Sequence, residues 1–273
     1  MEDVFDFGLN SPRPVHHELL DWLAREFIDP AEPESGIGSG GWRMKALHRL
    51  IVTSRVYRLS SSSDDAVTVN REIDPDNLYY WRANVRRLES EVIRDSVLVA
   101  SRTLDRTLGG EDLDYKDGEL TPRRSLYYRT AYEKQMLFLQ VFDGASPTEC
   151  YRRTESIVPQ QALALANSPL TPTHSRTLAR DLWAASKSEP ESHVTFVRSA
   201  FERILARQPE PKEERACLAY LKRQSTNLLD RYTSSSIQDK QESHLTPADR
   251  ADRRAREDLV QVLFNHNDFV TVR

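Results

Sequence analysis

Apolar residues recur at intervals of three and four along most of the chain, and this spacing restricts the possible folds more than any other feature. In residues 16–29, Leu19, Leu20, Leu23 and Phe27 share one side of a helix, and residues 42–60 show the same period. The spacing also predicts later helices, at residues 158–169, 172–186, 191–207, 211–230 and 247–265. The sequence therefore predicts a mainly α, multi-helix fold.

The middle of the chain combines a long helical pattern with a different one. Residues 73–104 are predicted to form one long helix, which Asp76 or Asn77 could cap by accepting hydrogen bonds from the first free N–H groups. Its apolar positions keep a period near 3.6, at Trp81, Val85, Leu88, Val92 and Val99. Residues 123–142 instead contain Tyr-rich and Phe-rich stretches bounded by Pro and Gly, and they could form a short two-stranded β element.

A change in composition near residue 170 suggests how the chain is divided. The segments before it are dense in arginine and aromatic residues, whereas ordinary amphipathic helices with Ala and Leu follow it. The 273 residues suffice for one large domain or two small ones. We expect an N-terminal helical lobe at 1–170 and a C-terminal helical lobe at 171–273, or one continuous domain that lacks part of its N-terminus.

Composition and charge narrow the function classes. The 38 basic and 42 acidic side chains give a formal net charge of -4, so no overall positive field draws nucleic acid to the chain. No apolar run is long enough for a membrane span, and the first ten residues lack the basic and apolar regions of a signal peptide. Two cysteines cannot form a four-cysteine zinc site, no Cys-x-x-Cys-His haem motif occurs, and the histidines lack ligand spacing. We therefore expect no metal and no cofactor in this chain.

Two motif-like strings fail on closer reading. Gly36, Gly38 and Gly41 match the letters of a dinucleotide-binding loop, but the preceding Pro-rich residues cannot form the strand that such a site requires. We interpret residues 30–41 as an inserted loop. The acidic residues 112–118 resemble a calcium loop but place Lys116 at a ligand position, so a solvated acidic turn is the better interpretation.

Arginine provides the best candidate site, since the chain has 31 Arg and 7 Lys. On the predicted helix 73–104, Arg87, Glu91 and Arg94 are four and three residues apart and share a face. Three more arginines in the middle segment complete the candidate cluster: Arg124, Arg152 and Arg153. The guanidinium groups could bind a sulfate, carboxylate or phosphate group, or they could form an internal ion-pair network with nearby acids.

Several strings in order carry a family resemblance: GWRMKALHRLIVTSRVYR, DPDNLYYWRANVRRLESEVIRDSVL, PRRSLYYR, FDGASPTECYRR and ESIVPQQALALANSPL. Together they resemble the planctomycete-type domain of unknown function, which is typically the C-terminal module of exported multidomain proteins that often carry a cytochrome-c-like domain. The resemblance implies a mostly helical domain whose partner is the upstream domain or a neighbouring gene product. Any haem would belong to that upstream portion or partner.

The resemblance supplies no known reaction, so three hypotheses remain. The first is an accessory or binding module that handles anionic polysaccharide, and the second is a catalytic domain, a hydrolase or an oxidoreductase partner, that acts on polysaccharide. The third is an inactive fragment of a split gene, because the family's segment upstream of Phe7 and Gly8 is missing here. Relatives are usually exported, although this chain shows no signal peptide of its own.

Overall fold

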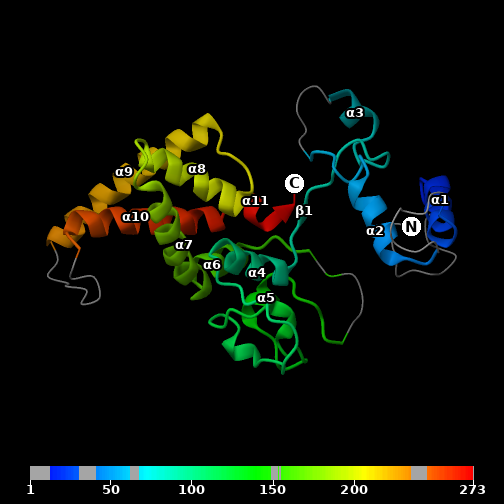
Figure 1. Cartoon of the computed structure of the whole chain (residues 1–273), viewed down its shortest axis with the longest axis horizontal. Coiled ribbons are helices and arrows are strands. Elements are labelled where there is room, and N and C mark those ends of the chain that lie inside the picture. The colour runs from blue at the N-terminus through cyan, green and yellow to red at the C-terminus, as the bar shows by residue number, and fades with distance from the viewer. Residues whose placement is uncertain are drawn as a thin grey trace. The chain divides into compact units, whose positions relative to one another are not determined.

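A computed structural model of the chain describes residues 13–30, 41–61, 68–148, 153, 155–234 and 245–272. These residues contain eleven α-helices and one two-stranded sheet, which confirms the predicted mainly α fold (Figure 1). The chain forms two compact units, residues 1–86 (with residue 273) and residues 87–272.

The first unit is built on a pair of amphipathic helices, α1 (His17–Ile28) and α2 (Met44–Thr53), which contact each other. The backbone N–H of Trp42 donates to the carbonyl of Phe27 over 2.6 Å, and the two rings meet edge to face. Neither helix has a fully buried residue. The helix predicted over 42–60 ends at Thr53 because Ser54 adopts an extended conformation. A short helix, α3 (Thr68–Ile73), follows.

The prediction of one long helix over 73–104 is wrong for its first half. Between residues 74 and 104, only α4 (Ser90–Ala100) is an α-helix. The Asp74 carboxylate accepts hydrogen bonds from the backbone N–H groups of Leu78 and Tyr79, both over 2.8 Å, and so caps a turn. Asn77 and Tyr80 have φ angles of 55° and 53°, in the left-handed region that a right-handed helix excludes. These local bonds override the apolar period.

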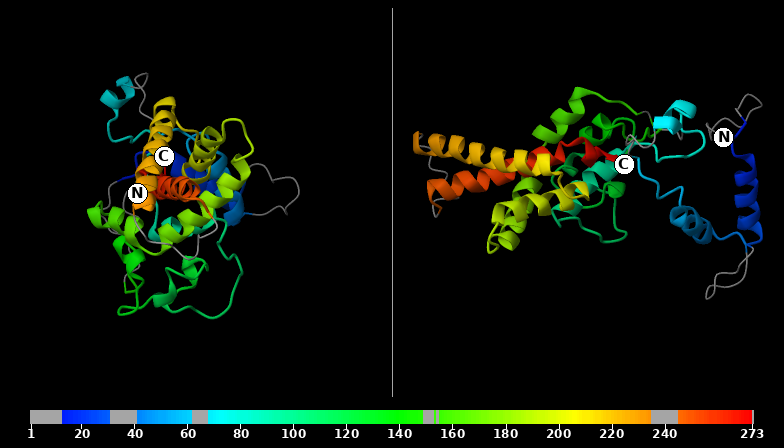
Figure 2. Two further views of the ribbon diagram at one scale, coloured as in Figure 1. Left: turned by 90° about the vertical axis from the view of Figure 1, so that its left-hand side faces the viewer. Right: turned by 90° about the horizontal axis from the view of Figure 1, so that it is seen from above.

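The second unit has a helical core formed by its later segments. The helices α6 (Pro159–Asn167), α7 (Leu170–Ser186), α8 (Ser192–Leu205), α9 (Pro211–Ser234) and α10 (Pro247–Phe264) confirm five of the predicted helices. Helices α9 and α10 lie side by side, and α10 also packs on α7 (Figure 2). Large apolar side chains from α8 and α10 are almost completely buried between the helices: Phe196, Val197, Phe201, Val260 and Phe264.

The two-stranded sheet does not lie where the sequence analysis placed it. Strand β1 (Arg86–Arg87) pairs with β2 (Thr271–Val272), which follows the short helix α11 (Asn267–Val270). The predicted β segment 123–142 instead contains a 3-10 turn, η3 (Ser125–Tyr127), isolated bridges and the helix α5 (Leu137–Val141). At the start of this segment the carbonyl of Arg123 accepts a hydrogen bond from the buried side chain of Arg94 rather than from a neighbouring strand, and the bridges further along stay isolated.

The predicted boundary near residue 170 falls inside the second unit. Helix α7, which begins at Leu170, packs against α4 and α6 on the other side of that position. Residues on both sides of 170 thus share one compact unit from residue 87 onward. The independence of the two proposed lobes stays a prediction.

Candidate functional site beside helix α4

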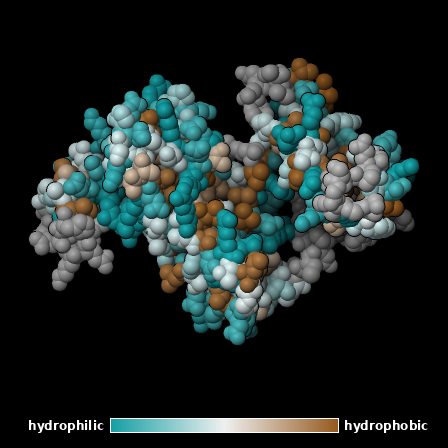
Figure 3. All heavy atoms as spheres, in the orientation of Figure 1, coloured by the Kyte–Doolittle hydropathy of each residue, from teal (hydrophilic) through white to brown (hydrophobic). Residues whose placement is uncertain are grey.

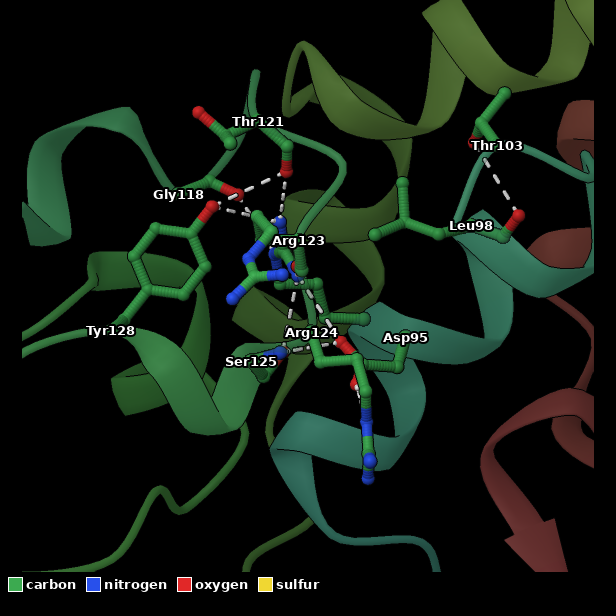
Figure 4. Close-up of polar contacts among 10 residues, drawn as sticks. Asp95, Leu98, Thr103, Gly118, Thr121, Arg123, Arg124, Ser125 and Tyr128 are labelled. Atoms are coloured by element: carbon green, nitrogen blue, oxygen red, sulfur yellow. Dashed lines mark hydrogen bonds and ion pairs between the residues drawn. The ribbon is translucent and has the colours of Figure 1, made fainter. Parts of the chain in front are cut away.

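Arg94 is the centre of the arginine cluster, and its side chain is 0% exposed. Its Nε donates to the carbonyl of Gly118 over 2.7 Å, and its terminal nitrogens donate to the carbonyls of Thr121 and Arg123 over 2.6 and 2.8 Å. Figure 4 shows Gly118, Thr121 and Arg123 grouped close together beside α4. Arg94 therefore fastens the segment 118–123 to α4.

Side chains complete the environment of Arg94. Asp95, Ser125 and Tyr128 accept further hydrogen bonds from its guanidinium over 3.1, 3.2 and 3.4 Å. Burial lowers the pKa of Arg94, although the neighbouring oxygens oppose this effect. Every nitrogen of the guanidinium already donates to a protein atom. Arg94 is consequently a structural residue and has no donor to offer a ligand.

Glu91, one turn before Arg94 on α4, forms a two-point ion pair with Arg153 over 2.5 and 3.2 Å. Burial alone would raise the pKa of Glu91, but the hydrogen bond from Arg153 and other contacts lower it overall. The same bond raises the pKa of Arg153. This pair joins α4 to the segment that precedes α6, and it stays ionised at neutral pH.

A groove of about 960 Å³ runs along the outer side of α4. Its polar lining combines the arginines Arg106, Arg124 and Arg153 with the acids Glu89, Glu91 and Asp95, and its apolar lining includes Val92, Val99, Leu108 and Leu126. These apolar side chains are exposed, and hydrophobic residues gather near the position of α4 on the face shown in Figure 3. A groove with both apolar walls and a few charged groups can hold a small ligand or a polymer segment.

Each carboxylate that lines the groove has an arginine partner. Arg153 lies 3.9 Å from Glu89 and 2.5 Å from Glu91, while Arg94 and Arg124 lie 3.1 and 3.9 Å from Asp95. The side chain of Arg106 makes no hydrogen bond or ion pair with any residue that the structure describes, and the side chain of Arg124 makes only its long contact to Asp95. The guanidinium groups of Arg106 and Arg124 are therefore the donors that a ligand could use.

The six predicted cluster residues do not all meet. Glu91 and Arg153 pair, and Arg94 and Arg124 both contact Asp95. Arg87 belongs to β1 rather than to a helix, and it donates to the carbonyl of Ser156 over 3.0 Å, away from the groove. The expectation that it shares a helix face with Glu91 and Arg94 is wrong because the helix begins only at Ser90. Arg152 lies outside the described residues.

Among the charged residues that line the groove, sequence reasoning missed Arg106, Glu89 and Asp95; Arg106 matters most because its guanidinium is exposed. It follows the left-handed residue Arg102 in an irregular segment, where no periodic pattern indicates which way a side chain points. Asp95 connects two segments, since its Oδ1 also accepts hydrogen bonds from the backbone N–H and hydroxyl of Ser125.

The acidic segment that resembles a calcium loop has a structural explanation. In the acidic segment 112–118, Asp114 accepts the N–H of Lys116 at the start of η2 (Tyr115–Asp117), and Asp112 pairs with Arg129. The described part of the chain contains no group of three His, Cys, Asp or Glu side chains that could hold a metal ion. Nor does any helix in it have the length and hydropathy that a membrane span requires. The glycine-rich loop, apart from Gly41, lies outside the described residues.

Among known protein families, the model of PSD1, described as "Protein of unknown function (DUF1553)", matches residues 1–221. The matched region includes every residue that lines the groove beside α4, whereas α10 lies beyond it. No curated protein matches the chain, and no solved structure matches it.

Proposed function

The chain belongs to the family PSD1, a family of unknown function, and on that premise we propose that it is an accessory binding module. Its groove beside α4 holds an anionic group of a polysaccharide. The observation that carries this proposal is the pairing pattern: the acids of the groove all have arginine partners, while Arg106 and Arg124 keep exposed guanidinium groups. An Arg fork binds a carboxylate or sulfate group through two parallel hydrogen bonds.

The apolar walls of the groove favour a carbohydrate over a bare anion. Val92, Val99 and Leu126 are exposed beside the two arginines. Sugar rings present C–H faces that pack on apolar side chains, while their charged substituents need cationic partners. A sulfated or uronic acid residue would use both kinds of surface at once.

The catalytic alternative demands a different arrangement of acids. Hydrolysis of a glycosidic bond normally uses two carboxyl groups, one of which is kept protonated by a raised pKa and acts as the general acid. The pKa of Glu91 is lowered, and its two oxygens are bound to Arg153. The groove therefore suits binding better than general acid catalysis.

The setting of the module is part of the same proposal. The family resemblance suggests that it works in a larger exported planctomycete protein, next to an upstream domain and with a cytochrome-c-like domain in the same protein or a partner. In that setting, the module would hold polysaccharide close to a domain that acts on it. The alternative of an inactive fragment predicts no ligand.

Thermal shift measurements with sulfated, uronic acid and neutral polysaccharides test the proposal. We expect the sulfated or uronic acid polymer to raise the melting temperature and the neutral polymer to have no effect. The double substitution Arg106→Gln and Arg124→Gln should abolish the shift. The matched control is Arg215→Gln with Arg223→Gln, which removes two exposed arginines from α9.

Two outcomes would contradict the binding proposal. One is a folded wild-type protein whose melting temperature no anionic polysaccharide changes. The other is an equal shift in the wild type and in the variant without Arg106 and Arg124. Release of reducing ends from any of the polymers would instead favour the catalytic alternative.

A further inference from the structure

A smaller pocket, of about 300 Å³, lies between helices α8, α9 and α10, which contact one another in pairs. Leu218 and Leu221 of α9 form part of its apolar wall. Its polar wall includes Lys222 and Ser225 of α9 together with Asp252 and Arg256 of α10. A pocket of this size, with apolar walls and a few polar groups, is suited to a small molecule.

Arg256 is the group of this pocket whose polar atoms the fold does not use. It is only 7% exposed, and its guanidinium carbon lies 3.9 Å from the centre of the Trp183 ring. That contact occupies the flat face of the guanidinium and leaves the N–H donors, which lie in its plane, available. They form no hydrogen bond or ion pair with a described residue, although buried polar groups in proteins nearly always have such a partner. The missing acceptor can come from a ligand in the pocket.

The charges around Arg256 are of both signs. Burial lowers its pKa; the carboxylates of Asp252, Glu257 and Asp249 oppose this effect by charge attraction, and Arg253 adds to it. Of these three acids, only Asp252 lines the pocket, and Glu257 is already bound by arginines of its own helix. A dianion such as phosphate would be repelled by the three carboxylates. A ligand with a negative and a positive end suits such surroundings better.

Asp252 lies one helical turn before Arg256 on α10. An Asp and an Arg at this spacing share a face of the helix and commonly pair, yet these two form no ion pair. The Oδ1 atom of Asp252 instead accepts a hydrogen bond from the hydroxyl of Ser225 on α9. Its Oδ2 atom makes no hydrogen bond with a described residue. The pocket therefore offers an unused acceptor one turn away from an unused donor fork.

We propose that this pocket binds an apolar α-amino acid. The ligand's carboxylate accepts the N–H fork of Arg256, and its ammonium group donates to Oδ2 of Asp252. An α-amino acid carries these two groups on one carbon atom, so they can reach two side chains that are one helical turn apart. Its apolar side chain packs on Leu218 and Leu221. This site is separate from the groove beside α4 and does not depend on the function proposed for that groove.

Isothermal titration calorimetry of the full chain, at pH 7 and constant ionic strength, tests this site with three ligands. L-leucine carries both charged groups, 4-methylpentanoate lacks the ammonium group, and 3-methylbutylamine lacks the carboxylate. We expect L-leucine to bind at least about tenfold more tightly than either analogue, because each analogue leaves one charged side chain of the pocket without its partner.

Two substitutions assign the ends of the ligand. Arg256→Met keeps an unbranched side chain beside Trp183 but removes the fork, and it should weaken L-leucine binding at least about tenfold. Asp252→Asn should weaken the binding of L-leucine by a similar factor but should not weaken that of 4-methylpentanoate. The matched controls are Arg223→Met on α9 and Asp181→Asn on α7, exposed positions that do not line the pocket. Both controls should bind L-leucine as the wild type does.

Circular dichroism melting shows whether each variant is folded. If Arg256→Met failed to fold, Asp252→Asn and the two analogues of leucine would decide. The proposal is overturned if the folded wild type does not bind L-leucine, or binds it no more tightly than 4-methylpentanoate. It is also overturned if either folded variant of the pocket binds L-leucine as tightly as its matched control.

Discussion

Replacing Arg94 by methionine should destabilise the second unit more than any other single arginine substitution in the α4 cluster. Methionine keeps an unbranched, flexible side chain but removes the guanidinium group, so the change isolates the hydrogen bonds from the packing of the stem. Those bonds connect α4 with three carbonyl groups of the segment 118–123, which has no continuous strand or helix of its own to hold it.

The size of the loss follows from the acceptors that would be left without a donor. The carbonyl of Thr121 keeps a hydrogen bond from the Tyr128 hydroxyl, and Asp95 keeps Ser125. The carbonyls of Gly118 and Arg123 keep no other hydrogen bond among the described residues. A buried polar group without a partner costs about 1–3 kcal/mol, so two of them give roughly 2–6 kcal/mol.

Urea unfolding followed by circular dichroism measures this difference in the free energy of unfolding. The matched control is Arg223→Met on α9, an exposed arginine for which we expect a change within about 0.5 kcal/mol. Hydrogen exchange adds a local readout: amides between residues 113 and 128 should exchange faster in the Arg94 variant. Equal stability of the two variants, with unchanged exchange in that segment, would refute the structural role of Arg94.

Three further changes test other parts of the second unit. Burial lowers the pKa of His174, so the free energy of unfolding should fall by up to about 1.4 kcal/mol per pH unit as the pH drops below about 6.5. Urea unfolding of the His174→Gln variant at several pH values should not show this decrease. The hydrogen bond from Arg207 lowers the pKa of Glu213 to about 2. In urea unfolding, Glu213→Gln should therefore lower the free energy of unfolding by about 1–2 kcal/mol at pH 7. This difference from the wild type should vanish as the pH falls from 4.5 towards 2. Gly118→Ala would place a Cβ 1.8 Å from the Met136 methyl carbon, so its melting curve should show a loss of about 1–3 kcal/mol.

The later helices could be predicted from the sequence because their signals are local. Each has an apolar face with a period near 3.6, and Pro159, Pro211 and Pro247 stand at the first helical position, where the missing N–H costs nothing. The segment 73–89 has the same apolar period but folds differently. There the string Asp74-Pro-Asp-Asn77 forms side-chain bonds to the backbone, and these bonds close a turn before a helix can start. In this segment the turn-forming residues Asp74 to Asn77 determine the backbone conformation, and the apolar period does not.

The sequence indicates some members of the candidate cluster but not its geometry. Spacing alone places Glu91 and Arg94 on neighbouring sides of α4. It cannot say that Arg94 turns inward, because that depends on the path of the segment 118–123 past the helix. The same holds for two arginines of α7. Arg176 and Arg180 are visible as a pair one turn apart, but their proximity to Glu257 requires knowing that α7 packs on α10.

The choice of arginine rather than lysine has a physical reason at position 94 on α4. Arg94 donates to acceptors in several directions from one planar group, and a lysine, whose three donors share a single nitrogen, could not reach carbonyls spread along residues 118–123. Its identity therefore follows from the fold.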